Sequence, residues 1–76
     1  MKAKELFGKE VIDVNIKVVG KIVDMEIDIK KGSILKILVR PGFLAKKVSI
    51  LPADIDKIGD KVTLKVAKAK VQHLTI

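Results

Sequence analysis

Apolar and charged residues alternate along much of the chain, in the two-residue rhythm that is typical of β-strands. The clearest example is the segment 20–29, where Val23, Met25, Ile27 and Ile29 are separated from one another by acidic residues. This pattern predicts a strand with one buried face and one solvent-facing face. Further strands are predicted at residues 10–14, 33–40, 48–51 and 62–66, the last of which would close a small barrel.

The segment Lys30-Lys31-Gly32 predicts a hairpin loop between the second and third strands, with Gly32 in the left-handed conformation. Such a loop places Ile29 opposite Ser33. The register that follows puts Glu26 opposite Lys36 and Asp24 opposite Leu38, with Arg40 diagonal to Asp24, and it turns Leu35, Ile37 and Val39 toward Met25 and Ile27 in the interior.

A single helical turn is predicted near residues 52–58. Pro52 has the fixed φ that suits the start of a helix, and Ile55 and Ile58 are spaced to lie on one side of it. Gly59 would end the turn before the last strand.

Three motifs follow one another along the chain: Gly-Lys-Glu-Val-Ile-Asp at 8–13, Val-Gly-Lys-Ile-Val-Asp at 19–24 and Pro-Ala-Asp-Ile-Asp-Lys-Ile-Gly-Asp at 52–60. No single motif is specific, but in this order and spacing they resemble the PRC-barrel family, and in particular its short stand-alone members found chiefly in archaea. The resemblance implies an all-β fold, a small twisted barrel of about five or six mostly antiparallel strands. Its core would span residues 6–66 of a single domain, 1–76.

The resemblance also implies a non-enzymatic module that mediates protein contacts. Related barrels occur in a ribosome maturation factor, in the photosynthetic reaction-centre H subunit and in short archaeal proteins linked to cell division. The favoured function is therefore an adaptor in cell division or regulation. The alternative is contact with RNA or a ribosomal protein during ribosome maturation or RNA processing.

The composition narrows the class of protein. The chain has 76 residues and no cysteine, so it has no disulfide framework, and a cytoplasmic location is expected. Neither a signal peptide nor a membrane-spanning helix is predicted, because no apolar run is long enough. The formal net charge of +7 comes almost entirely from lysines, which lack the bidentate geometry of arginine. We interpret most of them as a solvated surface, with charge steering of an anionic partner as the alternative.

The sequence indicates no catalytic, cofactor-binding or metal-ligating residues. His73, the only histidine, has no nucleophile or carboxylate beside it in the sequence. The acidic stripe Asp24, Glu26 and Asp28 repeats at about 6–7 Å along a strand, too widely for a single ion. These carboxylates are interpreted as cross-strand ion-pair partners of Lys36 and Arg40, or as an electrostatic contact for a basic partner. Neither a cofactor nor a small-molecule substrate is expected.

The segment between the first two strands, Val14-Asn15-Ile16-Lys17-Val18, departs from the polar turn usual in the family. Ile16 is β-branched and unsuited to positive φ, so either Asn15 takes that conformation or the first strand runs on through Val18. The apolar side chains then either form an exposed contact or fold back onto the core. The candidate protein-contact residues are Val14, Ile16, Val18, Leu74 and Ile76.

The tail, residues 67–76, has two interpretations: an extra strand at the sheet edge, or a segment that packs on a partner. An edge strand or the tail could also join two copies in a homodimer. For the RNA alternative, base stacking would fall to Phe43, because Phe7 is expected to plug the core. The candidate RNA-contact residues are Phe43 and the lysines Lys30, Lys31, Lys46, Lys47, Lys61, Lys65, Lys68 and Lys70.

Overall fold

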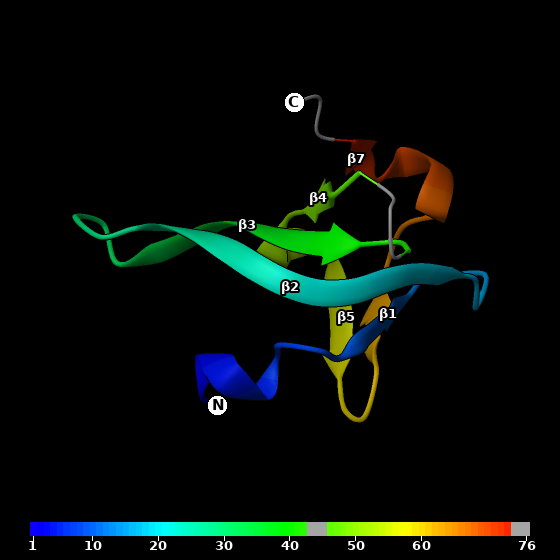
Figure 1. The fold of residues 1–76 in the computed structure, drawn as a ribbon, viewed down its shortest axis with the longest axis horizontal. Coiled ribbons are helices and arrows are strands. Elements are labelled where there is room, and N and C mark those ends of the chain that lie inside the picture. The colour runs from blue at the N-terminus through cyan, green and yellow to red at the C-terminus, as the bar shows by residue number, and fades with distance from the viewer. Residues whose placement is uncertain (43–45, 74–76) are drawn as a thin grey trace.

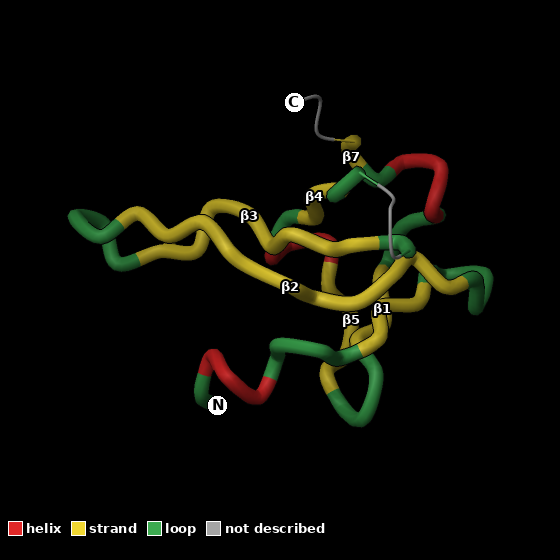
Figure 2. Tube along the Cα trace, in the orientation of Figure 1, coloured by secondary structure: helices red, strands yellow, loops and turns green. Residues whose placement is uncertain are grey.

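The computed structural model describes residues 1–42 and 46–73, and these build one strongly curved β-sheet (Figures 1 and 2). Short 3-10 turns connect or precede the strands at Ala3–Glu5, Pro52–Asp54 and Lys68–Lys70. The strands are β1 (Glu10–Ile12), β2 (Val18–Asp28), β3 (Ser33–Arg40), β4 (Val48–Ile50), β5 (Ile55–Ile58), β6 (Val62–Leu64) and β7 (Gln72–His73).

The sheet has seven strands in the order β5-β6-β1-β2-β3-β4-β7. Every neighbouring pair is antiparallel except β1 and β6, which run parallel. Within the described residues no pairing joins β5 to β7, so these two strands are the edges of the sheet. The predicted all-β fold is confirmed, with seven strands among the described residues rather than five or six. The prediction that the strand at 62–66 closes a barrel is wrong, because β6 lies inside the sheet between β5 and β1. The tail supplies the extra edge strand, β7, while Leu74 and Ile76 lie outside the described residues.

The core is aliphatic, as expected for a chain without tryptophan or tyrosine. Leu6, just before β1, is buried and contributes to this core, whereas its neighbour Phe7 is half-exposed. The prediction that Phe7 plugs the core is therefore wrong, because the chain turns between these residues and only Leu6 faces inward. The core residues are Leu6, Val11, Val19, Ile22, Ile37, Val39, Val48, Ile50, Val62, Leu64 and Val71.

The register of the β2–β3 hairpin is largely as predicted. Glu26 faces Lys36, and Asp24 faces Leu38. Asp28, rather than Ile29, faces Ser33, because the register shifts between Glu26 and Ile27. The Asp28 carboxylate and carbonyl accept hydrogen bonds from the backbone N–H groups of Lys31 (3.1 Å) and Gly32 (2.8 Å), which closes the turn one residue earlier. Gly32 adopts the expected left-handed conformation, with φ of 65°.

The predicted apolar face of β2 is only partly buried. A second register shift, between Ile22 and Asp24, buries Ile22 and turns Val23 outward. Toward the tip, the hairpin projects beyond the body of the protein as a long arm (Figure 1). The prediction that Ile27 and Leu35 meet in the interior is therefore wrong: both are about half-exposed, because no other strand covers this arm.

The helical turn predicted near 52–58 is shorter than expected. It ends at Asp54, whose carboxylate accepts a hydrogen bond from the backbone N–H of Leu51 at 3.2 Å. Residues 55–58 form β5 instead, paired with β6. The spacing of Ile55 and Ile58 is compatible with a helical turn and with a strand. Pairing with β6 favours the strand, because β-branched residues fit a pleated surface well.

Candidate functional site: the loop between β1 and β2

The loop of residues 13–17 is organised by one side chain, Asp13, which is only 3% exposed. Its Oδ1 accepts hydrogen bonds from the backbone N–H groups of Asn15 and Lys17, both at 2.8 Å. Its Oδ2 accepts one from the backbone N–H of Lys68, also at 2.8 Å. Asp13 therefore fixes the loop internally and ties it to the turn that precedes β7.

The pKa of Asp13 reflects these contacts. Burial raises it, but the hydrogen bonds from Lys17, Lys68 and Asn15, with the charge of Lys17, outweigh burial and hold the pKa below its ordinary value. The ionised carboxylate is thus favoured in the folded state. Its contribution to stability is fully present above the unfolded-state pKa of about 3.9 and is lost as the pH falls through the folded-state value.

We expect the substitution Asp13→Asn to lower stability at pH 7, because the amide cannot accept all three hydrogen bonds as the carboxylate does. The loss should shrink as the pH falls below about 4, where the wild-type carboxylate becomes protonated as well. Urea unfolding of both proteins between pH 7 and pH 2 measures this difference. The control is Asp24→Asn, since Asp24 is exposed and, among the described residues, its carboxylate accepts a hydrogen bond only from the N–H of Met25. A constant difference across the pH range would contradict the role assigned to Asp13.

Ile16 lies at the tip of the loop with φ of 63°, in the left-handed region. Both predicted alternatives are therefore wrong: Asn15 does not take the positive φ, and β1 ends at Ile12. The cause is the hydrogen bonding around Asp13. The Asp13 N–H donates to the Lys17 carbonyl (2.9 Å), and the Ile16 N–H donates to the Asp13 carbonyl (3.0 Å), so the left-handed position falls on residue 16.

The apolar side chains of this loop face solvent. Ile16 is 79% exposed, and Val14 and Val18 are each about half-exposed. The alternative in which they fold back onto the core is therefore wrong. We name Val14, Ile16 and Val18 the loop apolar surface. The other two candidate contacts, Leu74 and Ile76, lie outside the described residues.

A family model provides the decisive comparison. The PRC-barrel domain model matches residues 1–71 of the 76-residue chain. The chain belongs to the PRC-barrel family. PRC-barrel domains are small β-barrel modules, often devoted to protein contacts. A comparison with curated proteins finds no match.

The acidic stripe of this PRC-barrel lies exposed or half-buried along β2. Its predicted cross-strand ion pairs are not formed: among the described residues the only salt bridge joins Lys61 to Glu10. The carboxylates of Asp24 and Asp28 instead accept hydrogen bonds from nearby backbone N–H groups, of Met25 and Lys31. Glu26 and Lys36 thus face each other across β2 and β3 without forming a salt bridge between their charged groups. As an electrostatic contact for a basic partner, the stripe stays a prediction.

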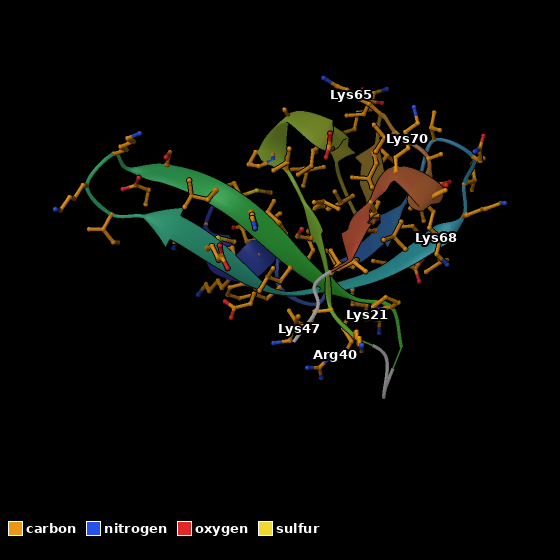
Figure 3. The ribbon with its side chains drawn as sticks, turned by 90° about the horizontal axis from the view of Figure 1, so that it is seen from above. Lys21, Arg40, Lys47, Lys65, Lys68 and Lys70 are labelled. Carbon is orange, nitrogen blue, oxygen red and sulfur yellow. The ribbon has the colours of Figure 1, made fainter. Side chains whose placement is uncertain are left out.

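The candidate RNA-contact lysines are dispersed over the barrel. Lys30 and Lys31 lie at the tip of the β2–β3 hairpin, while Lys61 bonds to Glu10 near the other end of the sheet. Figure 3 shows Lys65, Lys68 and Lys70 around the segment before β7, away from Lys47. Phe43 lies outside the described residues. The described lysines therefore do not converge on one groove.

In the described part of this PRC-barrel, no helix is both long and apolar enough to cross a membrane. No group of three or more histidine, cysteine and acidic side chains within residues 1–42 and 46–73 is arranged to hold a metal ion.

Proposed function

We propose that this PRC-barrel is a non-enzymatic adaptor that binds a protein partner through the loop apolar surface. The observation that carries the proposal is Ile16, an isoleucine that is 79% exposed and has φ of 63°. The more specific role, in cell division or regulation, rests on the resemblance to short stand-alone members of the family.

Ile16 is disfavoured by folding on two counts. A left-handed conformation costs a residue with a Cβ atom about 1–2 kcal/mol, and more so when the side chain is β-branched. The side chain also gains little from burial, because it projects into solvent. Glycine or asparagine would suit the turn better. The presence of an isoleucine that lowers the stability of the free protein is explained if a partner buries its side chain.

The RNA alternative is less well supported. Single-strand binding requires a continuous cationic groove with stacking side chains, and the candidate RNA-contact lysines that the structure describes are scattered over several elements. Contact with RNA or a ribosomal protein is therefore the competing hypothesis.

The test is a pull-down with tagged protein from lysate of the source cells, with and without nuclease. We expect the substitution Ile16→Gly to abolish capture of the partner and to raise the free energy of unfolding by about 1 kcal/mol, since glycine relieves the left-handed strain. The gain in stability, measured by urea unfolding, separates loss of contact from loss of fold.

The matched control is Ile29→Gly, which removes an exposed isoleucine from the tip of the other hairpin. It should leave capture of the partner unchanged. Equal capture by the Ile16→Gly variant would overturn the proposal. Loss of all captured protein after nuclease would favour the RNA alternative.

A further inference from the structure

Three cationic residues lie side by side on β2, β3 and the residue before β4. Lys21 and Arg40 face each other directly across β2 and β3. The next pair, Ile22 and Val39, is buried, so Lys21 and Arg40 lie on the opposite, solvent-facing side. Val39 also pairs with Val48, which places Lys47 beside Arg40. Figure 3 shows the three side chains gathered on one side of the molecule. We name Lys21, Arg40 and Lys47 the cationic row.

Like charges that face each other across two strands destabilise a sheet. The nearest carboxylate by register is Glu10, opposite Lys21 on β1, but it bonds to Lys61 instead. Within residues 1–42 and 46–73, no salt bridge involves any member of the cationic row. The row thus carries positive charge that no salt bridge neutralises in the described part of the fold.

A hollow of about 420 Å³ adjoins the β2 end of the row. Its lining combines the apolar Val18, Val23 and Pro41 with charged residues. The cations are Lys21 and Arg40, and the one carboxylate is that of Glu10, which is paired with Lys61. Val18 also belongs to the loop apolar surface. The hollow therefore joins the proposed protein contact to the cationic row in one continuous surface.

We propose that the partner docks an acidic segment here, with an aliphatic side chain in the hollow and two carboxylates on the cationic row. The proposal rests on the adaptor function proposed above and specifies the partner's chemistry. Charge complementarity favours this occupant. Adjacent strands lie about 4.8 Å apart, so the row spans about 10 Å, and alternate residues of an extended peptide repeat every 6–7 Å on one side. An aliphatic residue followed by acidic residues two and four positions later matches the hollow and the row.

The apolar lining also favours a peptide over a nucleic acid. None of the described residues that line the hollow is aromatic, so they offer no stacking platform for bases. The Arg40 guanidinium can donate two parallel hydrogen bonds to a carboxylate, and Lys21 and Lys47 add positive charge that attracts an acidic peptide.

The test uses a labelled peptide, Gly-Leu-Ser-Glu-Ser-Glu-Gly, titrated into the full chain and followed by fluorescence anisotropy and by backbone N–H signals in NMR. We expect saturable binding that weakens with salt and shifts the signals of Val18, Lys21 and Arg40. The same peptide with glutamine in place of glutamate should not bind. The substitution Lys21→Glu should weaken binding about tenfold or more, because it reverses one charge in the contact.

The control is Lys30→Glu, which makes the same change in net charge at the exposed hairpin tip. This variant should bind the peptide with an affinity within about twofold of wild type, since Lys30 lies far from the cationic row. Lys21→Glu places a carboxylate opposite Arg40 on β3, which is favourable, and opposite Glu10 on β1, which is unfavourable. Each cross-strand pair contributes about 0.2–1 kcal/mol, so the two effects oppose each other and the free energy of unfolding should stay within about 1 kcal/mol of wild type, as urea unfolding can check. Equal weakening by both variants, or no binding of the peptide, would overturn the proposal.

Two results separate this proposal from the adaptor function. If Lys21→Glu captures the partner as well as wild type while Ile16→Gly does not, the acidic-segment proposal fails and the adaptor function stands. If the peptide binds as expected but Ile16→Gly still captures the partner, the proposed role of Ile16 fails and the cationic row stands. If a uridylate decamer bound more tightly than the peptide and shifted the same NMR signals, the acidic-segment proposal would be overturned in favour of RNA binding.

Discussion

The substitution Gly20→Ala is expected to destabilise the protein by about 3 kcal/mol or more, or to prevent folding. A Cβ atom at residue 20 would lie 2.4 Å from the carbonyl oxygen of Arg40 and 2.8 Å from the Cα of Pro41. Both are backbone atoms at the end of β3, so they cannot move aside as a flexible side chain can. The φ of Gly20, 153°, adds to the strain.

The control for Gly20 is Gly59→Ala, because, apart from its chain neighbours, no described residue has a heavy atom within 4 Å of a Cβ added there. Its free energy of unfolding should stay within about 0.5 kcal/mol of wild type. Urea and thermal unfolding of the three proteins measure both effects. If the two alanine variants were equally stable, β2 and the end of β3 would not approach as closely as described.

The second large effect is expected for Ile22→Ala, which should cost about 3 kcal/mol of stability through lost apolar contact and the cavity left behind. Ile22 is only 1% exposed and belongs to the central core. Ile27, on the same strand, is 50% exposed, so Ile27→Ala should cost much less, below about 1.5 kcal/mol.

The comparison of these isoleucines is informative because the sequence pattern assigns them the opposite way. Simple alternation buries Val23 and Ile27 and leaves Ile22 on the other face. A larger loss for Ile27→Ala than for Ile22→Ala, in urea unfolding, would show that the alternation extends unbroken through β2 and that the register shift after Ile22 is absent.

Long strands with clear boundaries could be predicted from the sequence. The third strand was expected at Ser33–Arg40, and β3 has these bounds, because Gly32 and Pro41 interrupt the alternation on either side. The alternation of apolar and polar residues does not reveal a residue that has no partner on the neighbouring strand. Val23 on β2 and Leu35 on β3 have no partner across the hairpin, and each one-residue shift changes which side chains face the core.

The candidate site was only half predictable. Exposure of Ile16 was among the expected outcomes, since a short hairpin loop has few ways to bury its tip. Its left-handed backbone was not, because local preference favours Asn15 there. The contact that ties the loop to the turn before β7 joins Asp13 to the backbone N–H of Lys68, 55 residues later, and periodicity carries no information about such a contact. An aspartate at a strand end with an asparagine two residues later is the local signal that could have indicated a side-chain turn.

The parallel pairing of β1 with β6 constrains the order in which the protein folds. The Glu10–Lys61 contact beside this pairing closes a segment of 51 residues, whereas the β2–β3 hairpin closes over a single short turn. Long-range closure carries the larger loss of chain entropy and forms late. We expect β2 and β3 to associate first and β1 to be enclosed only when β6 arrives. During synthesis, the side of β1 that pairs with β6 therefore stays unpaired until the last third of the chain has been made.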